Sequence, residues 1–229
     1  MRFKVLLYRK GHLRSTVAIL VVMFSGLAGI DLAFVFIALV IGIVIHELMH
    51  GVVAYWLGDR TAADAGRLTL NPLASVDPLT TIIFPFILLI TTGIPFFAAK
   101  PVPFNPSVLK WDEFGEALVG LAGPATNFVL AILGASLYHL VPDASLVHDF
   151  ALYFTMVNIG IMVFNLIPIP PLDGSRVLYA FAPEPVQRVM RQIESFGFAA
   201  ILLVVFLVLM VLSPVIIAVQ RAILVFLLG

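Results

Sequence analysis

Long apolar runs separated by short polar stretches dominate the sequence. Residues 15–30 carry no charged side chain, and residues 32–57 are apolar apart from one small charged group. Four further runs contain no Asp, Glu, Lys or Arg: residues 78–99, 117–141, 150–172 and 195–220. Because a helix needs about 20 apolar residues to cross a bilayer, these runs predict a helical membrane protein. The alternating strands of a membrane β-barrel are missing from the sequence.

We therefore predict an all-α polytopic membrane protein with about six transmembrane helices, a re-entrant segment and a short β element after the second helix. The re-entrant segment is assigned to residues 78–99, because prolines and a glycine interrupt that run. The β element is assigned to residues 67–70, where polar and apolar residues alternate. The last two helices are expected at residues 195–213 and 214–229, the second returning across the membrane or lying in its interface.

No internal repeat or low-complexity tail divides the chain, so we expect a single integral-membrane domain over residues 1–229. Its core is expected at residues 32–182, with an N-terminal helix at 15–30 and C-terminal helices at 195–229. Basic residues ahead of the first apolar run favour a cytoplasmic N-terminus. The same pattern is compatible with a cleaved signal peptide, but cleavage would leave an apolar helix at the new terminus, so we favour an uncleaved helix.

Composition narrows the classes of function. Of the 229 residues, 62% are hydrophobic and 11% are charged, about half the charged share of an ordinary soluble domain. The formal net charge is zero, so no broad basic face is available for nucleic acid. The chain has no cysteine, which excludes disulfides, thiolate metal ligands and cysteine nucleophiles.

One group of ionisable residues lies inside the second apolar run: His46-Glu47-Leu48-Met49-His50. Residues four apart share a helix face, so His46 and His50 can present two imidazoles to one metal ion. Glu47 can then reach a water molecule at that metal as a general base. Ionisable groups inside a membrane helix cost on the order of 3 kcal/mol each unless a metal or a polar cavity stabilises them. The alternative is that they are packing residues, hydrogen-bonded to neighbouring helices.

A catalytic zinc site needs a third protein ligand and leaves a position for water. No third histidine follows at short spacing, and His139 and His148 flank a short loop, where we expect them at the surface. Asp173 stands out among the carboxylates, because it directly follows the rigid stretch Pro168-Ile169-Pro170-Pro171-Leu172 at the end of an apolar run. Taken alone, this position favours a cap for a helix that starts near Gly174.

The motifs together resemble the site-2 protease family of intramembrane zinc metalloproteases, in its compact bacterial-type subgroup without a PDZ domain. The resemblance spans residues 40–180 and includes the H-E-x-x-H group, the segment from Asn165 to Gly174, and Gly123-Pro124-Ala125-Thr126-Asn127.

That resemblance implies one Zn²⁺ ion per chain, held by His46, His50 and Asp173. It implies Glu47 as the catalytic base and Asn165 as a catalytic polar residue beside the substrate or the developing oxyanion. For Asn127, a role at the site and plain interhelical hydrogen bonding remain open.

The expected activity is therefore hydrolysis of peptide bonds in transmembrane or membrane-associated proteins, as in regulated intramembrane proteolysis, in a prokaryotic plasma membrane. The expected partners are a substrate helix and the lipid bilayer, whereas the oligomeric state is not indicated. A different membrane zinc peptidase would take Glu184 or Glu194 as its third ligand. A metal-binding or transport protein without peptidase activity is the alternative from another class, but it leaves Glu47 without a task.

Topology agrees with a shared site for His50 and Asp173. Both lie near helix ends that must face the same side, which requires an even number of crossings between them. Three apolar runs lie between residues 57 and 172, so one of them must not cross, and residues 78–99 are the best candidate. The positive-inside rule then makes the following basic residues cytoplasmic: Arg60, Arg67, Lys100, Lys110, Arg176, Arg188 and Arg191.

Overall fold

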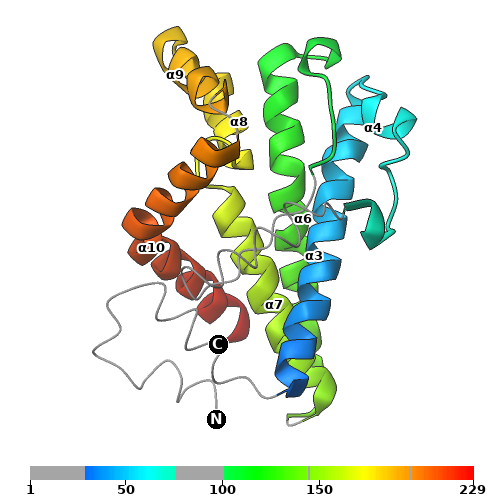
Figure 1. Ribbon diagram of the computed structural model, residues 1–229. Coiled ribbons are helices and arrows are strands. Elements are labelled where there is room, and N and C mark those ends of the chain that lie inside the picture. Colours follow the sequence, from blue (N-terminus) through cyan, green and yellow to red (C-terminus); the bar gives the residue numbers. More distant parts are fainter. Residues whose placement is uncertain (1–28, 76–100, 144, 196–197) are drawn as a thin grey trace.

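The computed structural model describes residues 29–75, 101–143, 145–195 and 198–229, and these form helices joined by loops (Figure 1). The long helices are α3 (Gly29–Trp56), α6 (Asp112–Leu140), α7 (Leu146–Asn165) and α10 (Phe198–Leu228). The short helices are α4 (Thr61–Asp64), α8 (Asp173–Phe181) and α9 (Glu184–Ser195), together with the 3-10 turns η1 (Pro72–Ser75) and η3 (Pro106–Val108). The predicted all-helical class is confirmed for this part of the chain.

Four of the described helices are long and apolar enough to cross a membrane: α3, α6, α7 and the Val211–Leu228 part of α10. Their outer faces expose large apolar side chains, among them Phe36, Val129, Leu133 and Val215. Such faces suit lipid rather than water. The predicted number of about six spanning helices is not confirmed, because the helix expected at residues 15–30 and the re-entrant segment at 78–99 lie outside the described residues.

Helix α10 runs without a break through Pro214, so the predicted division into helices at 195–213 and 214–229 is wrong. Proline removes only one hydrogen bond from the helix ladder. Leaving the helix at this depth would instead expose several backbone groups to lipid, which is far more costly. Continuation with a local bend is therefore favoured over a return.

The segment at residues 67–70 is not a β-strand, and no strand occurs among the residues that the structure describes. A strand needs a neighbour to satisfy its backbone. Here the bonds are local instead: the Arg67 N–H donates to the Ala62 carbonyl, and the Thr69 N–H donates to the Arg67 carbonyl. The alternation in sequence reflects one inward side chain, Leu68, which packs over Gly51 of α3.

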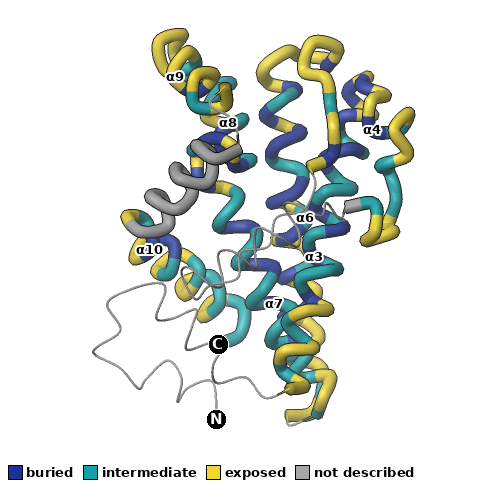
Figure 2. Tube along the Cα trace, in the orientation of Figure 1, coloured by how far each residue is buried: buried dark blue, intermediate teal, exposed yellow. Residues whose placement is uncertain are grey.

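Helix α6 lies against α3, α7 and α8, and α3 also contacts α7. Small residues allow these helices to approach closely. A Cβ atom on Gly42 of α3 would lie 2.9 Å from Asn158 Oδ1, and one on Gly134 of α6 would lie 2.6 Å from Thr155 Oγ1. Figure 2 shows the buried positions concentrated along these contacts, with the outer surfaces of the helices exposed.

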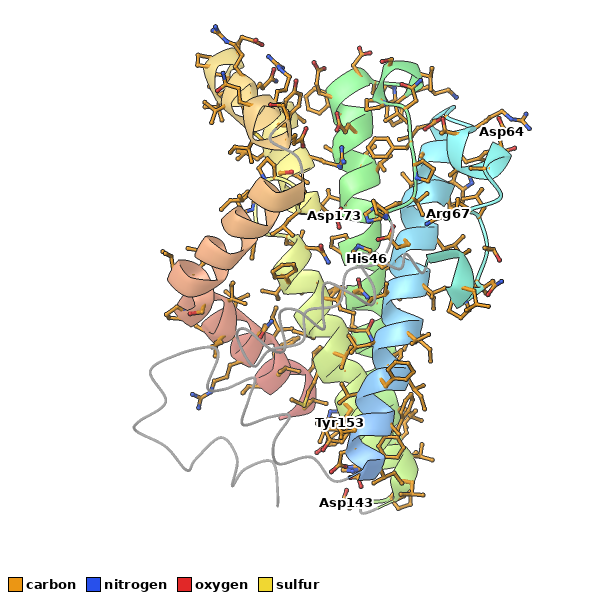
Figure 3. The ribbon with its side chains drawn as sticks, in the orientation of Figure 1. His46, Asp64, Arg67, Asp143, Tyr153 and Asp173 are labelled. Carbon is orange, nitrogen blue, oxygen red and sulfur yellow. The ribbon has the colours of Figure 1, made fainter. Side chains whose placement is uncertain are left out.

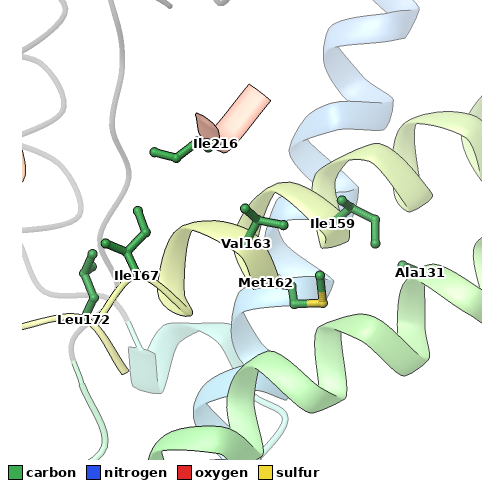
Figure 4. Close-up of a cluster of buried hydrophobic side chains, with 7 residues drawn as sticks. All are labelled: Ala131, Ile159, Met162, Val163, Ile167, Leu172 and Ile216. Atoms are coloured by element: carbon green, nitrogen blue, oxygen red, sulfur yellow. The ribbon is translucent and has the colours of Figure 1, made fainter. Parts of the chain in front are cut away.

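An apolar cluster joins α6, α7 and α10 and supports the segment that leads to α8 (Figure 4). Its buried members are Ala131, Ile159, Met162, Val163, Ile167, Leu172 and Ile216. Because Ile167 and Leu172 belong to this cluster, the turn between α7 and α8 is anchored in the core. Helices α4, α8 and α9 all lie at the end of the bundle where α3 ends and α6 begins (Figure 1).

Candidate metal centre

His46 and His50 on α3 face Asp173, the first residue of α8 (Figure 3 labels His46 and Asp173). The two imidazole Nε2 atoms are 3.0 Å apart. Asp173 Oδ2 lies 3.0 Å from Nε2 of His46 and 3.3 Å from Nε2 of His50. One ligand atom from each residue thus falls within 4.8 Å of the others, so the group could hold a metal ion. Among the described residues no other such group of three is present.

A short, irregular connection after α7 places Asp173 next to the two histidines. The Ile169 N–H donates to the Ile167 carbonyl, and the Leu172 N–H donates to the Ile169 carbonyl. The next residue must be glycine, because a Cβ atom on Gly174 would lie 2.3 Å from the Leu166 carbonyl oxygen. This close turn directs Asp173 back towards α3, and α8 then starts at that position. The carboxylate therefore stands at a helix N-terminus, which favours its charge.

Both imidazoles are held in one tautomer by hydrogen bonds to their Nδ1 atoms. His46 Nδ1 lies 2.6 Å from Asn127 Oδ1, and His50 Nδ1 lies 2.6 Å from the carbonyl oxygen of Val119. A carbonyl oxygen only accepts, so each Nδ1 carries the proton and each Nε2 presents its lone pair. Outer hydrogen bonds of this kind orient histidines for a metal.

The direction of the Asn127 amide is set by two further bonds. Its Nδ2 donates to the Gly42 carbonyl at 3.2 Å and to Asn158 Oδ1 at 2.9 Å. Asn158 in turn donates to the Phe154 carbonyl at 2.8 Å. Asn127 and Asn158 are fully buried. The question left open by the sequence is thus answered by the geometry: Asn127 bonds to the His46 ring and also joins neighbouring helices.

The three ligand atoms fit a metal ion on grounds of their own chemistry. With both Nδ1 atoms protonated, no N–H points at Asp173 Oδ2, and this buried oxygen has no hydrogen-bond partner. Two lone pairs and a carboxylate oxygen therefore converge within 3.0–3.3 Å of one another, which is unfavourable unless they share a cation. Two imidazoles and one carboxylate form a donor set that zinc accepts.

Electrostatics agree with a charged Asp173. Burial raises the pKa of its carboxyl, but His46 and His50 outweigh burial when an imidazole takes a second proton, at Nε2, so the pKa falls below its usual range. The oxygen is thus available as an anionic ligand.

Gly123 of α6 provides the surface on which the imidazoles rest. A Cβ atom at this position would lie 2.5 Å from His46 Cε1 and 2.5 Å from His50 Nε2. Asn127 is four residues further along the helix and therefore on the same face. The Gly-Pro-x-x-Asn segment thus combines a bare backbone with a hydrogen-bond acceptor for one of the rings.

The other predicted site residues lie as follows. Glu47 Oε2 accepts a hydrogen bond of 2.9 Å from the Val102 N–H, which belongs to the segment before η3. Asn165 is the last residue of α7, and its Nδ2 donates to the Ile161 carbonyl of the same helix at 3.0 Å. His139 and His148 are remote from the centre, at the junction of α6 and α7: His139 Nε2 lies 2.8 Å from the Leu227 carbonyl, and His148 stacks on Tyr138.

Three contributors were not found by sequence reasoning: the Val119 carbonyl, the Val102 N–H and the bare backbone of Gly123. The first two are main-chain groups, which any residue type supplies, so composition carries no signal for them. Gly123 and Asn127 belong to one motif, and their spacing of four in the sequence is the signal for a shared helix face.

Comparisons with known proteins point to one family. The sequence profile of Peptidase family M50 matches residues 141–213. "Putative zinc metalloprotease YwhC" of Bacillus subtilis is 38% identical over 184 residues, which are 76% of this chain and 78% of that protein. "Putative zinc metalloprotease Rip2" of Mycolicibacterium smegmatis is 30% identical over 67% of this chain and 59% of its own length. "Putative zinc metalloprotease MJ0611" of Methanocaldococcus jannaschii is 32% identical over 60% of this chain and 64% of its own length. No solved structure matches the chain.

Proposed function

Because this chain belongs to Peptidase family M50, the site-2 protease family of zinc metalloproteases, we propose that it cuts peptide bonds in transmembrane or membrane-associated segments of other proteins. The observation that carries the proposal is the convergence of Asp173 Oδ2, at the start of α8, with Nε2 of His46 and His50 on α3, a helix that can cross a membrane. Hydrolysis at this depth would act on chains that enter the bilayer, as in regulated intramembrane proteolysis.

In this proposal His46, His50 and Asp173 hold one zinc ion, and Asn127 and the Val119 carbonyl keep the two imidazoles oriented. When bound, zinc supplies a Lewis acid that acidifies water and polarises a carbonyl group. Glu47 takes one proton from the attacking water as the new C–O bond forms. It then delivers that proton to the nitrogen of the leaving amine as the C–N bond breaks. The products are a carboxyl terminus and an amino terminus.

Asn165 is proposed as a donor to the oxyanion or to the substrate backbone. Its Nδ2 atom would give up the hydrogen bond to the Ile161 carbonyl of its own helix and donate to the substrate oxygen instead. Such a switch is local, because Asn165 is the final residue of α7 and only partly buried.

We also propose that the centre faces the cytoplasm of a prokaryotic cell and that the N-terminus lies on the same side. The described basic residues outside the spanning helices support this orientation, because they gather near α4, α8 and α9 at one end of the bundle (Figure 1). They are Arg60, Arg67, Lys110, Arg176, Arg188 and Arg191. We further propose that residues 1–229 form one catalytic domain.

The test compares the wild type with Glu47→Gln in membranes of expressing cells. Mass spectrometry maps newly formed N-termini, and metal analysis of the purified proteins gives the zinc content. We expect one zinc per chain in both proteins and new termini inside apolar segments only with the wild type. Glu113→Gln is the matched control, since Glu113 is exposed at the start of α6, away from the centre.

Two results would contradict the proposal. Identical new termini with Glu47→Gln would remove Glu47 from the reaction. Bound zinc with no new termini in either protein would favour a metal-binding or transport role without peptidase activity.

A further inference from the structure

The backbone of residues 101–105 contacts Glu47, the residue that follows the proposed ligand His46. The N–H of Val102 donates to Glu47 Oε2 at 2.9 Å, between residues 55 positions apart. Pro101 and Pro103 flank Val102 and have no N–H of their own, so Val102 provides the sole backbone donor of this tripeptide. A residue that precedes proline also favours extended backbone, which limits the ways in which the N–H can point.

The 101–105 segment is held in place on both sides of that hydrogen bond. The Val102 side chain is buried and packs against Gly51, where a Cβ atom would lie 3.1 Å from Val102 Cγ1. At the other end the Asn105 N–H donates to Asp59 Oδ2 at 2.6 Å. Asp59 follows α3, the helix that carries Glu47. The segment is therefore fixed to the same helix as the carboxylate that it contacts.

A third attachment reaches the helix that carries Asp173. The guanidinium of Arg176 lies over the Phe104 ring at 4.5 Å from its centroid. Arg176 also pairs with Glu116 of α6 and stands one turn after Asp173 on α8. The 101–105 segment thus bridges the element with the proposed base and the element with the third ligand.

We propose that residues 101–103 are a positioning element for Glu47, an inference that rests on the proposed function. A glutamate side chain on a helix is flexible, and ordering it costs conformational entropy. The Val102 N–H anchors one carboxylate oxygen, Oε2, and leaves Oε1 for the proton that is taken from water and given to the amine. Val102 acts through Glu47 and is a positioning residue, not a catalytic one.

The hydrogen bond itself is tested by amide hydrogen exchange in the full-length, zinc-loaded protein. Residues 101–105 contain three backbone amides, those of Val102, Phe104 and Asn105, so their exchange can be separated. In Glu47→Ala we expect the Val102 amide to exchange about tenfold faster or more, because its charged acceptor is gone. The Asn105 amide is the internal control and should keep its rate. In Asp59→Ala the Asn105 amide should exchange faster, and the Val102 amide should keep its rate.

The consequence for catalysis is tested with Val102→Pro and Val102→Ala. The probe is a quenched fluorescent peptide that carries a bond identified by mapping of new termini. Val102→Pro removes the N–H, so we expect kcat to fall about tenfold or more, with KM changed by less than about twofold and one zinc still bound. Val102→Ala keeps the N–H and should retain a clearly larger share of kcat.

The outcomes separate this inference from the proposed function. An unchanged Val102 amide in Glu47→Ala, or wild-type kcat in Val102→Pro, would overturn the positioning role while Glu47→Gln remained inactive. A higher kcat in Val102→Pro would also overturn it, since the contact would then restrain the enzyme. Should Val102→Pro fail to fold, the exchange experiment still decides. Cleavage by Glu47→Gln would instead overturn the proposed function itself.

Discussion

Asn127 Oδ1 lies 2.6 Å from Nδ1 of His46 and joins helix α6 to the metal-binding face of helix α3. Asn127 is the acceptor in this hydrogen bond, because its Nδ2 atom already donates to the Gly42 carbonyl and to Asn158 Oδ1. His46 therefore carries its proton on the side away from the centre before any metal arrives.

Replacement of Asn127 by alanine should weaken zinc binding. His46 would lose its acceptor and sample the tautomer that carries a proton on Nε2, so we expect an affinity about 10- to 100-fold lower. A competition titration with a zinc chelator measures the change. Ser136→Ala is the control on the same helix, because the Ser136 hydroxyl donates only to the Ile132 carbonyl. Equal zinc affinity in Asn127→Ala and wild type would show that the His46 ring is oriented by other contacts.

Gly123→Ala should abolish stoichiometric zinc binding, whereas Gly160→Ala should not. The new methyl group on Gly123 would lie 2.5 Å from both imidazoles, and the rings have nowhere to retreat while Nδ1 is bonded. At Gly160 the nearest atom to a new Cβ is Gln220 Nε2 at 4.0 Å. There alanine should raise stability slightly, by up to about 1 kcal/mol, since it is the better helix former. Metal analysis and thermal unfolding in detergent provide the two readouts.

Removal of zinc should lower the melting temperature of the protein, and added zinc should restore it. An ion that binds the folded chain at 1,000 times its dissociation constant stabilises it by about 4 kcal/mol. The ligands come from α3 and α8, so removal of zinc should also speed up amide exchange in Asp173–Phe181. Asp173→Asn weakens the site and is the control: a chelator should hardly shift its melting temperature. An equal shift in that variant would mean that the chelator acts elsewhere.

Asp59→Asn should destabilise the protein at neutral pH by about 1–3 kcal/mol. Burial raises the pKa of the Asp59 carboxyl, but the hydrogen bonds from Thr61 and from the Asn105 N–H outweigh it, and the pKa is lowered. The stabilisation is therefore complete above the unfolded value, near 3.8, and is lost as the pH falls through the lower folded value.

The melting temperatures of Asp59→Asn and wild type should consequently begin to approach each other below about pH 4 and meet only below the lower folded pKa of Asp59. Asp64→Asn is the matched control, because Asp64 is exposed and its oxygen lies 3.8 Å from the Arg60 guanidinium. Its effect should stay within about 0.5 kcal/mol at every pH. A difference between Asp59→Asn and wild type that persisted into acid would show that the charge of Asp59 is not the cause.

The helical class and the shared helix face of His46 and His50 follow from patterns that a single sequence records. Apolar run length reports the spanning helices, and a spacing of four places two imidazoles on one face. The remote carboxylate is harder, since a lone aspartate after prolines also suits a helix cap, and it is the resemblance to a known family that indicates a ligand.

Other features depend on tertiary contacts that leave no local pattern. The alternation at residues 67–70 suggested a strand, but a strand also needs a partner, and here Leu68 simply packs over Gly51. Pro214 suggested a break, but surrounding lipid favours the intact helix. The hydrogen bond from Val102 to Glu47 depends on a main-chain N–H that lies 55 positions away in the sequence and is brought close only by the fold.

The buried amides behind His46 also decide where hydrogen ions can travel. Carboxamides donate and accept but do not ionise, so Asn127 and Asn158 cannot relay a proton from the imidazole towards the far leaflet. This pair of amides therefore separates the His46 ring from the core between α3, α6 and α7 without offering a site that can take up a proton. Hydrolysis on one side of the pair can thus proceed without passing hydrogen ions through it.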